Sequence, residues 1–459
     1  MEISADEMEN CLRVLQQVAD SRGSIRRSDH FNALIAKVYR QSKKFDLRAE
    51  RQRQWTEDRA AQAQTAMVRI QRDALSAGTL SLPPLVEEAR VLNRPETCYI
   101  CKEDYTEVHF FYHLLCPKCA ETNFTMRHLS ADLRGRTALI TGGRVKIGYQ
   151  TVLRLLRDGA KVILTTRFPN AAARRFFAEA DSGAWRERLQ VYGLDLRNLP
   201  SVEQFAQHLL HTEPAIDIVI HNAAQTIARP PGFYTELLAG EEPGTLGIEA
   251  SHLVAQDAPA TTSADSVSLL PTMASPSVDI LPADKWEDNE ERADSRDTNS
   301  WLLRLDEVSA PEMLEVQLVN AVAPFLLNSR LKPLLMSSPF ARRFIVNVSA
   351  MEGQFSRHKT VFHPHTNMAK AALNMMTRTS GADYARDGIY MNSVDTGWVT
   401  DENPAAKREK IQEERGFFAP LDIVDGMARI YHPVAQGINN TDEEPFAGRF
   451  LKDYAPCPW

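Results

Sequence analysis

Four of the six cysteines in this chain of 459 residues are grouped as two Cys-x-x-Cys pairs, Cys98 with Cys101 and Cys116 with Cys119. Two such pairs separated by a short segment have the spacing of a tetrahedral four-cysteine zinc site. Four thiolates suit Zn²⁺ and close its coordination shell, which leaves no position for a catalytic water. The pattern therefore predicts a structural zinc that stabilises a module too small to fold on a core of its own.

Three alternatives to this structural zinc stay open. His109 and His113 lie between the two pairs and could substitute as ligands. The cysteines could instead be buried without a metal, or the module could be a partner-binding knuckle that resembles a ring-type or ribbon finger. Clustered cysteines in a chain of this length favour a metal site over a disulfide scaffold. The same pattern indicates that the protein is located in a reducing compartment.

A glycine-rich turn at residues 141–148 follows a short apolar run at residues 137–140. The run is too short for a helix and is typical of a buried parallel strand, while residues 149–157 carry apolar side chains at helical spacing. In this context glycines let the backbone approach a pyrophosphate, and the helix N-terminus offers it free amides. We therefore predict a dinucleotide site whose turn residues are Thr141, Gly142, Gly143, Arg144, Lys146, Ile147 and Gly148.

The end of the next apolar strand, residues 161–167, favours one cofactor over another. An acidic residue there would accept hydrogen bonds from the ribose 2′-hydroxyl of NAD(H), but this strand ends in Thr166 and Arg167. A guanidinium suits a 2′-phosphate, and Arg144 in the glycine turn adds a second positive charge. The sequence thus predicts NADP(H) rather than NAD(H).

Two further strand ends complete the predicted cofactor site. The strand 189–194 is followed by Asp195 and Leu196, and Asp195 is placed to meet an adenine amino group. The strand 216–220 is followed by His-Asn-Ala-Ala, whose small side chains let the backbone pass close to a cofactor. The predicted cofactor-binding residues therefore include Asn222, Ala223 and Ala224.

From about residue 133 onward the chain resembles the short-chain dehydrogenase/reductase family. The matches occur in order: the glycine turn, the strand end 221–224, Asn320 within a helix, the strand 344–349, a helix carrying Lys370, and the segment 392–400. The resemblance implies an α/β fold with a doubly wound, Rossmann-type parallel sheet and a cofactor at the carboxyl ends of its strands. It also implies that Gly397 and Val399 lie along the nicotinamide, and that the protein is a homo-oligomer.

Reductases of this family use a tyrosine as proton donor, a lysine four residues later, a serine and an asparagine. Lys370 and Asn320 match this set, but the tyrosine position is Thr366, and a one-residue shift of the alignment restores no tyrosine. The serine position aligns with Ala350, while Ser349 stands one residue earlier and would point to the opposite face of the strand. The resemblance therefore implies a hydride-transfer site that lacks its usual proton donor.

Two departures have candidate substitutes in the sequence. His363 and His365 stand just before the helix of Lys370, and a histidine titrates in the range needed to protonate an alkoxide. The alternative is that these histidines belong to a polar loop above the cleft. Lys146 replaces the middle glycine of the family's turn, and its cationic side chain could itself pair with a phosphate.

Two functions follow from these residues. The first is an NADP(H)-binding oxidoreductase that transfers hydride to or from a carbonyl or imine, with catalytic candidates Lys370, Asn320, His365, Thr366 and Ser349. The second is a catalytically inactive NADP(H)-binding pseudoenzyme that acts as a sensor or as a scaffold for other proteins. The sequence identifies no substrate for the first and no partner for the second.

The chain divides into a helical N-terminal region, 1–92, the four-cysteine zinc module, 93–130, and the dehydrogenase-like domain, 131–459. The N-terminal helices are expected to present a solvated face or to form a dimerisation arm. Residues 231–300 are rich in Pro, Ser, Thr, Asp and Glu, which predicts a mobile acidic insertion, with a lid or partner-docking role as the alternative.

Composition excludes several classes of partner. The net charge of −7 argues against nucleic acid as the main partner. No apolar run reaches the roughly 18 residues of a membrane span, and the N-terminus lacks a secretory signal. We therefore expect a cytoplasmic protein that acts on a small molecule, and whose zinc module or acidic insertion would be the contact for any protein partner.

Overall fold

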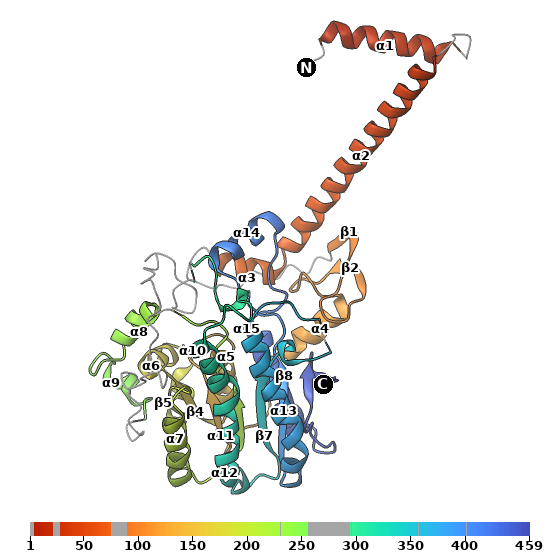
Figure 1. The fold of residues 1–459 in the computed structure, drawn as a ribbon. Coiled ribbons are helices and arrows are strands. Elements are labelled where there is room, and N and C mark those ends of the chain that lie inside the picture. Colours follow the sequence, from red (N-terminus) through yellow and green to blue (C-terminus); the bar gives the residue numbers. More distant parts are fainter. Residues whose placement is uncertain are drawn as a thin grey trace.

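The computed structural model describes residues 4–21, 28–74, 90–229, 231–255, 294, 296–356, 358–400 and 402–459. From residue 137 onward these form one large sheet with helices on both faces, and the N-terminal helices extend away from it (Figure 1). Most of the predicted acidic insertion, residues 256–293, lies outside the described residues.

The large sheet has eight strands in the order β10-β9-β8-β7-β6-β3-β4-β5, and all neighbours are parallel except β10 and β9. The order reverses between β3 and β6, so the carboxyl ends of these two strands border the crevice in which doubly wound sheets bind ligands. This confirms the predicted fold class. The strands are β3 (Thr137–Thr141), β4 (Lys161–Thr166), β5 (Leu189–Gly193), β6 (Ile218–His221), β7 (Arg343–Ser349), β8 (Ile389–Asp395), β9 (Phe450–Lys452) and β10 (Ala455–Cys457).

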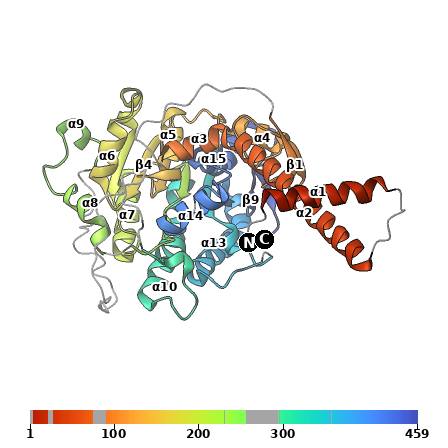
Figure 2. The same ribbon diagram turned by 90° about the horizontal axis from the view of Figure 1, so that it is seen from above.

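Strand sequences such as Ala-Leu-Ile in β3 and Phe-Ile-Val in β7 are buried along their whole length, as expected for parallel strands covered on both faces. One hydrophobic core packs Leu153, Phe176 and Tyr431 against the sheet, and a second packs Phe205 and Leu327 against the opposite face. Figure 2 shows α5 and α15 on one side of the sheet and α10 and α13 on the other. The helices of this part are α5 (Lys146–Arg157), α6 (Pro169–Phe177), α7 (Leu199–Thr212), α10 (Ala310–Gln317), α11 (Ala323–Arg330), α12 (Lys332–Met336), α13 (Pro364–Arg386), α14 (Ala405–Arg415) and α15 (Ile423–Asn439).

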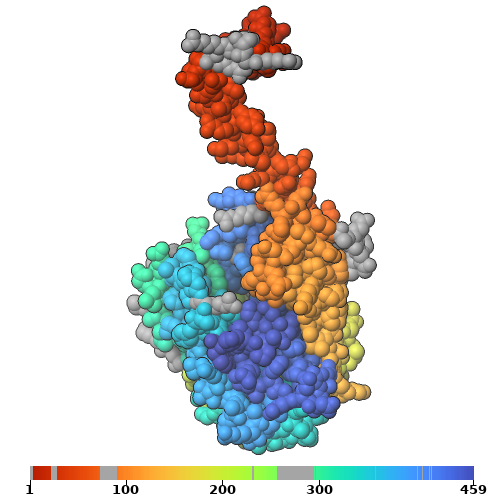
Figure 3. Space-filling view, turned by 90° about the vertical axis from the view of Figure 1, so that its right-hand side faces the viewer, coloured from red at the N-terminus to blue at the C-terminus, as the bar shows by residue number. Residues whose placement is uncertain are grey.

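The four-cysteine region is a small unit beside the C-terminal end of the sheet domain. It consists of the antiparallel strands β1 (Arg90–Thr97) and β2 (Asp104–Val108) and the helix α4 (Pro117–Met126). Its core of Tyr112 and Leu115 also includes Met67 of α3 (Ala66–Ala74) and Leu421 of the sheet domain. Figure 3 shows this unit lying directly against the last residues of the chain.

Two N-terminal helices, α1 (Ala5–Asp20) and α2 (Asp29–Ala63), project from this body and contain no buried residue among those described (Figures 1 and 3). Ser4 caps α1 through a reciprocal capping box with Glu7, and Ser28 caps α2. None of the helices in the described ranges is long and apolar enough to cross a membrane.

The prediction of a mobile insertion over residues 231–300 is too broad at its start. Residues 231–255 form η3 (Pro231–Tyr234), α8 (Thr235–Ala239) and α9 (Ile248–Ser251), and Val254 pairs with Val191 beside β5. The physical reason is that Phe233 and Leu253 bury their side chains, which a reading of bulk composition overlooks.

Candidate cofactor and catalytic site

The glycine turn between β3 and α5 has the close packing that a pyrophosphate cradle requires. A Cβ at Gly148 would stand 2.3 Å from the carbonyl oxygen of Gly142 and 2.4 Å from Nδ2 of Asn222. Gly142 has φ +70°, and Lys146 adopts φ +54°, a backbone conformation that favours glycine. The residue that replaces the family's middle glycine therefore keeps the glycine geometry, and α5 begins with it.

The ends of β3 and β6 are tied together at this turn. Asn222 donates from Nδ2 to the carbonyl oxygen of Gly142 over 2.8 Å, and the amide of Ala223 donates to Oγ1 of Thr141 over 3.1 Å. Thr141 is buried, whereas Ala224 is exposed. These contacts bring together the turn and the strand end that the sequence assigned to one cofactor site.

The two predicted ligands of a 2′-phosphate, Arg144 of the glycine turn and Arg167 after β4, lie near the same aromatic ring. Arg144 and Arg167 each place their guanidinium carbon 5.4 Å from the ring centroid of Phe168. Arg167 also donates from Nη2 to the hydroxyl of Tyr234 over 3.0 Å, and Oγ1 of Thr166 accepts from the amide of Phe168. The two arginines thus flank one aromatic ring beside a residue of the insertion.

Asp195 is engaged in a way that the sequence did not reveal. Its carboxylate accepts hydrogen bonds from the guanidinium of Arg197, one of them 2.6 Å long, and Arg197 lies 3.4 Å from Glu315. Burial raises the pKa of Asp195, but the hydrogen bonds from Arg197 outweigh it and lower the pKa overall. A contact with adenine would therefore be made by a carboxylate already held by Arg197, next to the buried Leu196.

Lys370 and Asn320 are both buried at the carboxyl side of the sheet. Lys370 on α13 donates from Nζ to the carbonyl oxygen of Val348 over 2.9 Å, and burial lowers its pKa to about 8. Asn320 lies in the π-helical turn η5 (Leu318–Val322), where Oδ1 accepts from the amide of Gln225 and Nδ2 donates to the Gln225 carbonyl. Single π-helical turns are frequent at functional sites.

Two buried hydroxyls remain without a hydrogen-bond partner among the described residues. They are Oγ of Ser349, at the end of β7, and Oγ1 of Thr366, on α13 four residues before Lys370. Leaving a buried hydroxyl unpaired costs about 1–3 kcal/mol, so such groups are normally satisfied by water or a ligand. Neither hydroxyl is therefore used by a hydrogen bond within the described part of the fold.

The two candidate histidines have different surroundings. His363 stacks on Trp301 with ring centroids 3.9 Å apart, and burial lowers its pKa. His365 is almost fully buried, with Nε2 3.6 Å from Oε1 of Glu312 on α10. Glu312 lies 53 positions earlier in the chain, and no motif in the sequence pointed to it.

The segment after β8 that holds Gly397 and Val399 contacts the four-cysteine region. Gly397 has φ +76°, and the amide of Trp398 donates to the hydroxyl of Tyr99 over 2.9 Å. Val399 is buried in the same hydrophobic cluster as the cysteines, and Ile147 of the glycine turn packs against that cluster. Tyr99 was visible only as the spacer of the first cysteine pair, so its role at this segment was missed.

The four cysteines converge as their spacing predicted. Their sulfur atoms all lie within 4.8 Å of one another, and Sγ of Cys101 is 3.7 Å from Sγ of Cys116. Four sulfurs about 2.3 Å from a tetrahedral Zn²⁺ would stand about 3.8 Å apart. The amide of Cys116 also donates to Sγ of Cys98, so the cluster can hold a metal ion.

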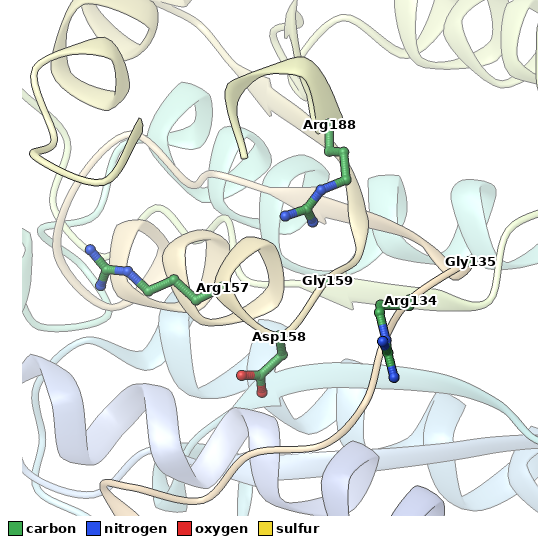
Figure 4. A pocket seen from close by; sticks show the side chains of 6 residues that line it. All are labelled: Arg134, Gly135, Arg157, Asp158, Gly159 and Arg188. Atoms are coloured by element: carbon green, nitrogen blue, oxygen red, sulfur yellow. The ribbon is translucent and has the colours of Figure 1, made fainter. Parts of the chain in front are cut away.

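A hollow of about 550 Å³ lies at the opposite end of the sheet (Figure 4). It is lined by residues that precede β3, β4 and β5: Arg134, Gly135, Arg157, Asp158, Gly159 and Arg188. Its three arginines are committed, Arg134 to Asp132, Arg157 to Asp181 and Arg188 to two backbone carbonyls. This hollow is therefore not part of the candidate site.

Comparison with known proteins identifies two segments of the sheet domain. Residues 136–236 match the family described as short chain dehydrogenase, and residues 301–422 match the one described as Enoyl-(Acyl carrier protein) reductase. An uncharacterized protein, R665, of Acanthamoeba polyphaga mimivirus is 31% identical over 377 residues, covering 77% of this chain and 75% of the viral protein.

Two other similar proteins show how far the likeness extends. Dehydrogenase/reductase SDR family member 13 of Bos taurus is 44% identical over 94 residues, which cover 20% of this chain and 24% of that protein. The crystal structure of the short chain dehydrogenase from Shigella flexneri is 18% identical with a TM-score of 0.44, covering 72% of this chain and 95% of that one.

Proposed function

The chain belongs to the short-chain dehydrogenase/reductase family, and from this premise we propose that it is an NADP(H)-dependent oxidoreductase that transfers hydride to or from a carbonyl or imine. The observation that carries the proposal is the glycine turn. Gly142, Gly148 and Asn222 pack so closely that a side chain at Gly148 would close the cradle, and Lys146 holds the backbone conformation of a glycine. The residues present thus fit a dinucleotide.

The preference for NADP(H) is supported by Arg144 and Arg167, which flank Phe168 at the end of β4. Two guanidinium groups near one aromatic ring are suited to a phosphate. The sequence at the end of β4 has no acidic residue that would accept a hydrogen bond from a ribose hydroxyl.

NADPH, when bound, would supply the hydride. Lys370, held by the Val348 carbonyl, would donate to the ribose hydroxyls, and Asn320 would hold the Gln225 backbone beside the nicotinamide end. The unpaired hydroxyls of Ser349 and Thr366 would orient the substrate oxygen. A threonine hydroxyl is a very poor acid near neutral pH, so it would orient rather than protonate.

The proton donor that we propose is His365. An imidazolium can act as a general acid, and the Glu312 carboxylate, 3.6 Å from Nε2, would form an ion pair with the ring when the ring is protonated. The second candidate function is a cofactor-binding protein without turnover, which senses NADP(H) or serves as a scaffold. Thr366 at the position of the family's tyrosine favours that alternative.

We further infer a structural Zn²⁺ in the four-cysteine cluster, because its four sulfurs lie within 4.8 Å of one another, close enough to share one ion. Free thiolate ligands are kept in a reducing compartment, which agrees with the expected cytoplasmic location. We propose that any protein partner would bind the four-cysteine region or residues 231–255 of the insertion.

The experiment is calorimetric titration with NADPH and NADH, followed by NADPH fluorescence over time with a panel of aldehydes, ketones and imines. Turnover that is lost in His365→Ala, only reduced in Thr366→Ala and kept in the exposed control His358→Ala supports the oxidoreductase with His365 as donor. NADPH binding without turnover on any substrate supports the cofactor-binding alternative. Absence of binding to either nucleotide overturns both.

A further inference from the structure

A segment of the insertion, residues 231–241, folds over the end of β4 where the 2′-phosphate is expected. Tyr234 accepts a hydrogen bond from Arg167, whose guanidinium carbon lies 4.6 Å from the Tyr234 ring centroid. Phe233 is buried, and Arg174 donates to the carbonyl oxygen of Gly240 over 3.2 Å. The segment therefore holds two of the cations in this region through contacts of its own.

The same segment places a carboxylate on the N-terminus of α6. Oε2 of Glu241 accepts from the amide of Asn170 over 2.8 Å, and Oε1 accepts from the amide of Ala171 over 2.9 Å. These amides belong to the first turn of a nine-residue helix, where unpaired donors and the helix dipole favour an anion. Arg174 and Arg144 also act on this carboxylate electrostatically.

Glu241 thus stands where several features suited to a phosphate converge. The helix begins two residues after Arg167, and Arg144 lies against the same Phe168 that Arg167 flanks. The residue before the helix, Phe168, offers no side-chain cap, so the cap comes from the carboxylate of Glu241, 71 positions after Asn170. A single negative group from the insertion therefore occupies donors that an anionic ligand would use.

We propose that Glu241 is a specificity-determining residue whose carboxylate competes with the 2′-phosphate of NADP(H) for the α6 N-terminus and the nearby arginines. Binding of the phosphorylated cofactor then requires residues 231–241 to withdraw, whereas a nucleotide without the 2′-phosphate meets no such competition. The segment acts as an internal anion that lowers NADPH affinity without touching the nicotinamide end. This inference rests on the proposed NADP(H) function.

A helix cap with no bearing on the cofactor is the structural alternative, and two variants separate them. Glu241→Gln keeps an oxygen acceptor for the α6 amides but removes the negative charge. Glu242→Ala removes the neighbouring exposed carboxylate and is the matched control. Binding of four probes, NADPH, NADH, 2′,5′-ADP and 5′-AMP, is measured by calorimetry on the full chain, with thermal unfolding as a check on folding.

We expect Glu241→Gln to bind NADPH and 2′,5′-ADP about tenfold more tightly than the native chain, a change of about 1.4 kcal/mol. NADH and 5′-AMP should bind as before, and Glu242→Ala should change none of the four. Equal NADPH affinity in the native chain and Glu241→Gln would overturn the competition and leave the proposed function standing. Weaker binding of all four probes to Glu241→Gln would instead identify a purely structural cap. Absence of binding in every variant would remove the proposed function and this inference together.

Discussion

At the scale of single residues, Lys146 combines two effects that can be separated. Its φ of +54° costs an L-residue about 1–2 kcal/mol relative to the ordinary helical region, and its side chain adds a cation to the predicted pyrophosphate turn. Glycine relieves this strain, but it also has more conformational freedom in the unfolded chain, which offsets part of the gain. We therefore expect Lys146→Gly to raise the free energy of unfolding by roughly 0.5–1 kcal/mol. We expect the same variant to bind NADPH several-fold more weakly, because it loses a cation beside the phosphates.

Lys146→Ala is the control for this prediction, because it removes the charge and keeps a Cβ. It should show the loss of affinity without the gain in stability, as measured by urea unfolding and calorimetric titration. Unchanged NADPH affinity in both variants would mean that Lys146 makes no phosphate contact. The sequence located this lysine at a glycine position, but only the backbone angle shows that the strained conformation is retained.

Residues whose partners are close in sequence were predictable, and residues with distant partners were not. The four cysteines and the glycine turn carry their chemistry in short spacings, and they converge as predicted. Glu312 beside His365, Tyr99 beside Trp398 and Glu241 on α6 are 53, 299 and about 70 positions from their partners. No local pattern encodes such pairs, since each depends on how the chain returns to the same place in the fold.

At the scale of elements, the four-cysteine region is joined to the cofactor segment by specific contacts. Tyr99 accepts from the amide of Trp398, and Arg127 pairs with Asp422, the residue that caps α15. We expect Tyr99→Phe to raise the NADPH dissociation constant up to about tenfold, because one hydrogen bond contributes about 0.5–1.5 kcal/mol to the order of this segment. Removal of the metal by a chelator should give a larger loss, since it frees the whole unit.

Tyr105→Phe is the matched control, because the Tyr105 hydroxyl donates to the His113 carbonyl within the same unit and does not reach the cofactor segment. Zinc content by atomic absorption should stay at one per chain in both variants, and only Tyr99→Phe should lose NADPH affinity. An equal loss in the two variants would indicate general loosening of the unit and contradict a specific link through Tyr99.

Elements with a strong apolar pattern were predicted closely. The strand expected at 161–167 is β4 (Lys161–Thr166), and the one expected at 216–220 is β6 (Ile218–His221). The helix expected from residue 149 begins at Lys146. The prediction used the spacing of apolar residues, and Lys146 and Gly148 in the first turn do not contribute to that pattern. The prediction for the insertion was based on its overall composition, which is dominated by polar residues. It therefore overlooked the few apolar side chains that are buried within residues 231–255, where helices form.

At the scale of the whole molecule, the projecting helices α1 and α2 present apolar side chains to solvent, among them Leu12, Leu34, Val38 and Phe45. The two helices have opposite charge: α1 carries four acidic and one basic side chain, and α2 carries eight basic and five acidic ones. This complementarity favours pairing of α1 from one copy with α2 of a second copy, which would bury both apolar stripes. We therefore predict a homodimer formed through the arms.

The double variant Leu34→Asp with Val38→Asp should shift the chain from dimer to monomer, because it places two carboxylates within the apolar stripe of α2. Leu305→Asp is the control, since Leu305 is an even more exposed leucine on the body of the molecule rather than on the arm. Light scattering across a concentration series measures the mass, and NADPH titration confirms that the sheet domain is intact. A monomeric native chain at all concentrations would exclude self-association, whereas a dimer that survives the double variant would show that the interface lies outside the α2 stripe.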